Sequence, residues 1–556
     1  MLIDKIVNLY NRKLQKDKIL KETALWAVAA FVVSCVLSVF LYAKGFETHP
    51  IEHVFYYFFI LFIVFCVLNP FSSLYLLRFD KTRFSFVATT VVIIGVCVLC
   101  TLPMGLNPVW NGEKPGHRNQ YEELASALLE GHLDVHRDAD VSALTAMENP
   151  YDINARKAAK VSYYWDHAFY KGHYYVYFGV VPAVIVFAPY KALTGTDLIT
   201  WKGTALFAIF TVLAIFMLGR QIIRKMKASV PLLIYLTLCS CISISSLWYA
   251  VKYPAMYCTA IVSGICFAIW SFYLFFKTLF VDDSPSILKI TLGALCGALV
   301  FGCRPPIGLT EIALLPLIYA YVKRSVAKNN KAELKKLARQ AAAFILPYVI
   351  IACLLMAYNY ARFENPFEFG QSYQLTVTDQ TSYAKGLLDR LSLADWINYA
   401  GTYFLTFIPI DGPFPWVTQK SGLLLVMPVF LLAFQRWALK DKYKTLRWFH
   451  IMLLVGIALL IEAQVLNAPN AGVRYRMDFS FLLGIAVLFK VFCEYQDVPD
   501  AGTPHKTYSL WIVYLCFFTM FVAFLLFFAK GDSSLVESNV NRANRLIYFF
   551  TLNKMF

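Results

Sequence analysis

The chain has 556 residues, of which 59% are hydrophobic and only 15% charged, and its mean hydropathy is +0.57. Apolar runs of about 20 residues, long enough to cross about 30 Å of hydrocarbon, recur along the whole sequence and exclude a string of soluble domains. The net charge of +16 lies in short basic segments between these runs, which is the pattern of cytoplasmic loops and argues against a nucleic-acid partner. We therefore predict an all-α polytopic membrane protein.

The apolar runs predict about thirteen transmembrane helices. The first follows a lysine-rich stretch and lacks a small-residue cleavage site, so we expect a retained span rather than a signal peptide. The predicted spans lie near 23–43, 54–77, 84–106, 200–220, 229–249, 256–277, 287–303, 307–322, 341–358, 421–436, 448–466, 478–493 and 508–529. With the basic segments inside, this count places the N-terminus in the cytoplasm and the C-terminal tail outside.

Two apolar segments do not fit as crossings. Residues 177–193 are interrupted by Pro182 and Pro189 and carry Lys191, and residues 402–416 are similarly rich in proline. We expect residues 177–193 to form a re-entrant or interfacial segment on the outer face, and residues 402–416 to be similar.

We divide the chain into an N-terminal segment with two spans (1–83), a middle part (84–500), and a last span with an external tail (501–556). The middle part carries a large outer loop at 107–175 and a second outer segment at 359–420. In the large loop, apolar residues at helical spacing from Tyr121 precede Gly131, which predicts a short amphipathic helix that ends at a glycine.

Residues 163–175 of the outer loop are unusually rich in aromatic and ionisable side chains, among them Asp166, His167, Lys171 and Tyr175. Aromatic faces stack on sugar rings, and a carboxylate beside them can accept a proton from an attacking hydroxyl. The alternative interpretation is an aromatic belt at the membrane interface, with Asp166 capping a turn.

Arginines in short outer loops are a second signal, since the charge bias should keep them inside. Arg304 lies between two spans, and Arg474 and Arg476 precede the next span on the same face. Guanidinium groups at headgroup level are suited to phosphate, and the alternative is a structural pair with Asp478. Arg362 lies among aromatic residues at the end of a predicted span. This segment would either shape a groove for the acceptor or tie the loop to the bundle.

Motifs of other enzyme classes are missing from the sequence: there is no Walker loop, no dinucleotide fingerprint, no HExxH and no GxSxG. His132 and His136 are four residues apart, but Gly131 argues against a continuous helix that would pair them on a metal. No cofactor is indicated with certainty, and a divalent metal stays open.

The order of parts resembles the GT-C class of integral membrane glycosyltransferases, which includes protein O-mannosyltransferases and aminoarabinose transferases. The segments that carry the likeness, over roughly 84–500, are Asn119-Gln120-Tyr121, Glu148-Asn149-Pro150-Tyr151-Asp152, Tyr175-Val176-Tyr177-Phe178-Gly179 and Tyr358-Asn359-Tyr360 with Arg362-Phe363. The likeness is to a bacterial GT-C-like group, with the two N-terminal spans as an addition to the core.

The resemblance implies an acidic residue just before Tyr121 that acts as a base or positions a metal. Here Arg118, Asn119 and Gln120 occupy those positions, so they are expected to contact substrate instead. Glu122 is the nearest replacement. Asp166 is favoured as the base, because aromatic surroundings raise a carboxyl pKa toward a working value.

The resemblance implies transfer of a sugar from a polyprenyl-phosphate donor to a hydroxyl of a glycan, lipid or protein, with inversion at the anomeric carbon. The site would lie on the external face of a bacterial plasma membrane, and no soluble nucleotide sugar would be needed. Two other functions stay open: a transporter or flippase for a lipid-linked glycan, and a non-catalytic assembly protein of the same fold.

Overall fold

A computed structural model describes residues 2–44, 50–80, 82–116, 118–282, 285–381, 392–408, 415–435, 443–467, 471–496 and 503–551. Over these residues the chain is helical with one small two-stranded sheet, which confirms the predicted all-α membrane architecture. Outside them lie residues 552–556 of the predicted tail, parts of 359–420, and Pro409 and Pro413, on which the interfacial prediction for 402–416 partly rests.

Nine helical segments of the described chain are long and apolar enough to cross a membrane. They are Asp17–Ala43 of α1 (Leu2–Ala43), Arg83–Gly105 with α3 (Arg83–Thr101), α8 (Thr200–Met226), α9 (Leu232–Lys252), Met256–Val281 with α10 (Met256–Phe275), Pro305–Val326 with α12 (Leu315–Val326), α13 (Lys331–Phe363), α17 (Lys444–Asn467) and Thr507–Phe527 of α19 (Thr503–Phe527). Each coincides with a predicted span.

The other four predicted spans are not among these nine segments. The first comprises α2 (Pro50–Phe62) and a π-helical turn, the second is α11 (Ile287–Cys303), and the last is α18 (Met477–Glu494). Residues 421–436 hold only α16 (Leu423–Val426) and the 3-10 helix Pro428–Phe434. The count of thirteen crossings and the GT-C likeness therefore stay predictions.

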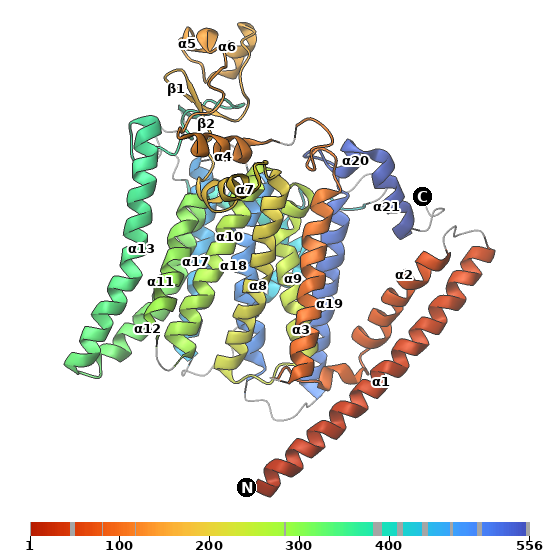
Figure 1. Cartoon of the computed structure of the whole chain (residues 1–556). Coiled ribbons are helices and arrows are strands. Elements are labelled where there is room, and N and C mark those ends of the chain that lie inside the picture. The colour runs from red at the N-terminus through yellow and green to blue at the C-terminus, as the bar shows by residue number, and fades with distance from the viewer. Residues whose placement is uncertain are drawn as a thin grey trace.

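Helices α8, α9, α10 and α18 form the centre of the bundle. Nearly every residue of α18 is buried, and α9 and α10 are buried over most of their length, whereas α13 and α1 are largely exposed. A helix that is apolar all round and exposed is suited to contact with lipid. Figure 1 shows α13 at one edge of the bundle and the α1–α2 pair at the other.

The large loop folds into a layer at one end of the bundle, opposite the N-terminus of α1 (Figure 1). The layer contains α4 (Gln120–Glu130), α5 (Ser142–Thr145), α6 (Ile153–Ala158), β1 (Ala168–Tyr170), β2 (His173–Tyr175) and α7 (Ala188–Thr194). As predicted, α4 ends at Gly131, whose φ of 84° lies in the left-handed region. The short helices α20 (Leu535–Ser538) and α21 (Val540–Thr551) lie at the same end.

The β1–β2 hairpin is antiparallel and pairs Ala168 with Tyr175. Its two-residue turn, Lys171-Gly172, has positive φ at both positions, which matches the twist of a tight hairpin. On the other edge of β1, residues 373–375 add an extended segment through backbone hydrogen bonds to residues 166–169. The hairpin thus fixes residues 166–168 between two distant parts of the chain.

The chain after β2 returns close to the bundle at Gly179. A Cβ atom here would lie 2.1 Å from the carbonyl oxygen of Cys303 and 2.4 Å from that of Gly302, so glycine permits this approach. The proline-interrupted segment that follows, Ala183–Thr194, is one of the shorter apolar helices and packs on α4. Its length agrees with the predicted interfacial position rather than with a crossing.

Candidate functional site

Asp166 lies where the layer formed by the large loop meets the bundle. Its side chain is 5% exposed, and its Oδ2 accepts hydrogen bonds from Nη1 of Arg118 at 2.8 Å and from the Tyr257 hydroxyl in the first turn of α10. Among the described residues both bonds reach Oδ2, which leaves Oδ1 available to another partner. The backbone of Asp166 has a φ of 58°, a left-handed conformation that non-glycine residues rarely adopt.

The electrostatic surroundings of Asp166 act in opposite directions. Burial raises the pKa of its carboxyl group, and the positive charges of Arg118 and Arg474 offset part of that rise. The net direction is upward. A carboxyl group in these surroundings can hold a proton more readily than an exposed aspartate.

Arg474 supplies a cation close to Asp166. Its guanidinium carbon lies 4.1 Å from the ring centroid of Tyr257 and 5.1 Å from that of Tyr475, and Nη2 donates to the Tyr475 hydroxyl at 3.3 Å. No carboxylate of the described residues forms an ion pair with it. Tyr257 therefore links the two groups, because its ring stacks on Arg474 and its hydroxyl binds Asp166.

The other predicted arginines are engaged in the structure. Arg304 donates to both carboxylate oxygens of Asp478 at 2.7 Å, and Gln464 also donates to that carboxylate. Arg476 is buried and donates to the backbone carbonyls of residues 402, 419, 420 and 421. Arg362 donates to the carbonyl of Val176 and the side chain of Asn359. These contacts position loops on the bundle.

The residues at the start of α4 have mixed environments. Oε1 of Glu122 accepts from the backbone N–H of Thr200 at 2.8 Å and from its hydroxyl at 3.1 Å, so this carboxylate lies at the N-terminus of α8. Asn119 is the residue before α4, with no side-chain cap bond, and Gln120 is buried. Of the predicted residues 118–122, only Arg118 contacts Asp166.

The remaining predicted residues lie elsewhere in the layer. Nζ of Lys171 binds the exposed carboxylate of Glu364 at 2.6 Å, and the Tyr175 ring packs edge-on against Phe363. His167 is buried, and its Nε2 lies 2.9 Å from Oε2 of Glu123. None of the three takes part in the hydrogen bonds that link Arg118, Asp166 and Tyr257.

Comparison of the chain with family models, characterised proteins and solved structures gives no match. Membership of the GT-C class stays a prediction on the residues quoted above.

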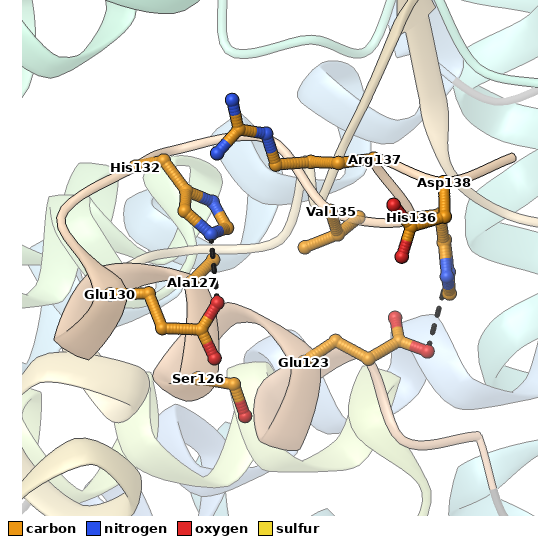
Figure 2. Close-up of a pocket in the computed structure, with 9 residues that line it drawn as sticks. All are labelled: Glu123, Ser126, Ala127, Glu130, His132, Val135, His136, Arg137 and Asp138. Atoms are coloured by element: carbon orange, nitrogen blue, oxygen red, sulfur yellow. Dashed lines mark hydrogen bonds and ion pairs between the residues drawn. The ribbon is translucent and has the colours of Figure 1, made fainter.

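Sequence reasoning did not select Glu123, which faces two histidines of the same loop. Its Oε1 lies 3.3 Å from Nε2 of His136, and Figure 2 shows these two side chains in contact at one side of a pocket. Burial alone would raise the pKa of the Glu123 carboxyl group. The contacts with His136 and His167 outweigh this effect and lower that pKa to about 2. With His167, these are the residues of the described chain whose ligand atoms lie close enough to share a metal ion.

Two other residues were also missed. Tyr257 lies just inside a predicted span, where one aromatic residue gives no signal of its own. Glu311 is a single carboxylate within the span Pro305–Val326, and its Oε2 accepts from the Ser271 hydroxyl at 2.9 Å and from the Tyr348 hydroxyl at 3.4 Å. Its position in an apolar run was the signal that could have identified it.

Proposed function

We propose that the protein is an inverting glycosyltransferase that moves a sugar from a polyprenyl-phosphate donor to an acceptor hydroxyl at the outer face of a bacterial plasma membrane. The observation that carries the proposal is the arrangement around Tyr257. It joins a buried carboxylate, Asp166, to Arg474, a guanidinium that forms no ion pair with a carboxylate of the described chain. A base and an anion-binding group in one aromatic-walled site fit this reaction.

In the proposed reaction, Oδ1 of Asp166 takes the proton of the acceptor hydroxyl as the acceptor oxygen forms its bond to the anomeric carbon. The bond between that carbon and the phosphate oxygen breaks, and its electron pair leaves with the polyprenyl phosphate. Arg474, together with Arg118, balances the negative charge that grows on the phosphate. Attack from the side opposite the leaving group inverts the anomeric configuration.

The arginines divide into two roles under this proposal. Arg474 and Arg118 bind the donor phosphate, because each presents positive charge beside Asp166. Arg304, which is bound to the carboxylate of Asp478, orients the loop that carries Arg474. Arg476 and Arg362 hold neighbouring segments through backbone carbonyls.

The test is transfer of labelled sugar from a set of polyprenyl-phosphate sugars by the purified full chain in detergent, with nucleotide sugars as a negative control. Arg474→Gln should lower kcat/KM for the lipid donor by about 10- to 100-fold, since a hydrogen bond to a charged group contributes roughly 1.5–3 kcal/mol. Arg137→Gln is the matched control, because this outer-layer arginine is 61% exposed. Turnover of nucleotide sugars alone, or equal losses in both variants, would contradict the proposal.

Glu311 favours a second candidate, transport of a lipid-linked glycan. It follows Arg304 by seven residues, mostly of 3-10 helix, so at about 2 Å per residue it lies about 14 Å deeper, near the middle of a hydrocarbon layer of about 30 Å. Carboxylates at that depth commonly mark ion or substrate pathways.

Transport predicts that Glu311→Gln abolishes movement of a lipid-linked sugar across proteoliposomes that contain the protein. Transfer predicts that the same variant keeps wild-type sugar transfer within about threefold, because the hydrogen bonds of Glu311 go to Ser271 and Tyr348 and not to the groups around Asp166. Measuring both quantities on one preparation separates the two functions.

A further inference from the structure

Three side chains from separate segments of the outer layer converge on one point. Glu123 comes from α4, His136 from the turn after that helix, and His167 from the residue before β1. Their ligand atoms all lie within 4.8 Å of one another, with Oε1 of Glu123 at 3.3 Å from Nε2 of His136 and Oε2 at 2.9 Å from Nε2 of His167. The side chains are at most 17% exposed.

The imidazole ring of His167 is oriented as in metal-binding histidines. Nδ1 of His167 lies 3.0 Å from the carbonyl oxygen of Trp165, which can only accept a hydrogen bond, so Nδ1 carries the proton. In the neutral ring this leaves the lone pair of Nε2 facing the carboxylate of Glu123. A backbone carbonyl that fixes the tautomer in this way is the usual second partner of a metal-ligating histidine.

His136 is held in place by unusual means. Its ring stacks on Tyr164 with centroids 3.5 Å apart and an angle of 6° between the planes, and its backbone has a φ of 55°. Its Nε2 is buried and has no hydrogen-bond partner in the described part of the chain, although the carboxylate of Glu123 is near. A cation between this nitrogen, the carboxylate of Glu123 and the second imidazole would give all three groups a partner.

We propose that Glu123, His136 and His167 bind a zinc ion. With zinc–ligand bonds of about 2.0–2.1 Å, adjacent ligand atoms in a tetrahedron are about 3.3 Å apart, a value within the separations seen here. Two imidazoles and one carboxylate are a known ligand set for zinc, with a fourth position left for water or another ligand. This inference does not rest on the transferase proposal, since none of the three proposed zinc ligands takes part in the Arg118–Asp166–Tyr257 contacts.

The fourth position has room. Glu123 and His136 line a cavity of about 650 Å³, whose far side carries Glu130 and His132 (Figure 2). His132 is already engaged by Glu130 at 3.0 Å, so it is a neighbour of the site rather than a fourth ligand in this arrangement. Arg137 also lines the cavity, but its guanidinium is mainly exposed and lies 3.6 Å from Asp134, which offsets its charge.

The bound ion would connect three segments that are otherwise joined through loops. Asp166 directly precedes the ligand His167, so the ion would also restrain the backbone that positions the Asp166 side chain. Each ligand comes from a different segment, and metal binding therefore adds stability to the folded layer.

The test is metal analysis of the full chain purified in detergent without added chelator, by inductively coupled plasma mass spectrometry. We expect about one zinc per chain in the wild type and in His132→Ala, and at least a tenfold loss in His136→Ala. His132→Ala is the matched control because it removes a histidine from the same cavity without removing a ligand. Iron or manganese in place of zinc would overturn the zinc assignment.

A second measurement guards against variants that fail to fold. Chelator-treated wild-type chain is titrated with Zn²⁺ against a competing indicator and then melted with and without the ion. Zinc should bind with one site and raise the melting temperature, and replacement by Co²⁺ should give a visible absorption band of low-coordinate cobalt. Absence of zinc in the purified chain, together with no binding and no shift in melting temperature, would refute the site.

Discussion

The two carboxylates considered as catalytic can be separated by one pair of isosteric substitutions, Asp166→Asn and Glu122→Gln. In Asp166→Asn, the amide oxygen can occupy the position of Oδ2 and still accept from Arg118 and Tyr257, while the amide nitrogen replaces Oδ1. The change removes the proton acceptor and keeps the surrounding contacts. In Glu122→Gln, the amide oxygen can still accept from the N–H and hydroxyl of Thr200.

The structure predicts different magnitudes for the two variants. Loss of a general base lowers the rate by about 10²- to 10⁴-fold, or about 3–5 kcal/mol of activation free energy, and Asp166→Asn should show this loss in kcat. Glu122→Gln weakens a charged hydrogen bond at the N-terminus of α8, which should lower the free energy of unfolding by about 1–2 kcal/mol. Its transfer rate should stay within about threefold of wild type.

The assay measures labelled-sugar transfer and thermal unfolding on the same purified samples in detergent, at a temperature well below the midpoint of unfolding. Donor binding by Asp166→Asn should remain close to wild type, which distinguishes lost chemistry from a lost site. If Asp166→Asn kept its transfer rate and Glu122→Gln lost it, the assignment of Asp166 as the base would be wrong, and Glu122 would be the base instead.

Four further substitutions, one of them a control, test how the site is held. Arg476→Gln should lower the free energy of unfolding by about 2–4 kcal/mol, because it removes donors from several backbone carbonyls; an unfolding midpoint equal to wild type would show that these carbonyls find other partners. Gly179→Ala should destabilise the chain by about 1–3 kcal/mol through overpacking against Cys303, whereas Gly95→Ala, with open space at its Cβ position, should be neutral or slightly stabilising. Thermal melting of the two glycine variants side by side tests this, and equal midpoints would contradict it. Lys171→Ala should leave the midpoint of chemical denaturation unchanged, since the pair with Glu364 is exposed on both sides; a lower midpoint would indicate a role beyond this pair.

Most of the bundle could be predicted because a span needs only local information: about 20 apolar residues and flanking charge. The segment at 421–436 shows what hydropathy leaves undetermined. Its apolar run predicts a span, but Pro428 and the contacts of Arg476 with residues 419–421 favour a short helix and a 3-10 turn. Hydropathy reports the environment of a segment and not its backbone conformation.

The site was less predictable, because its partners are brought together by tertiary contacts. Arginines in the short loops predicted to be outside singled out these residues, but the sequence cannot tell which arginine forms an ion pair with a carboxylate. Arg304 binds Asp478, 174 residues away, while Arg474, four residues from that same carboxylate, does not pair with it. Spacing along the sequence suggests a pair between Arg474 and Asp478. In the structure, the positions of α11 and α18 bring Arg304 to Asp478 instead.

Asp166 and His167 show how one short segment can serve two sites. The left-handed backbone at Asp166 and the pairing of residues 166–169 with residues 373–375 fix the direction of both side chains. The carboxylate of Asp166 contacts Arg118 and α10, whereas the ring of His167 contacts Glu123 on α4. A non-glycine residue in this conformation costs free energy, which the surrounding hydrogen bonds must offset. Replacing Asp166 by glycine would relieve that strain and lose the carboxylate, so retained zinc with lost transfer in Asp166→Gly would show that the two sites are separable, whereas loss of both would mean that Asp166 also holds the metal-binding segment in place.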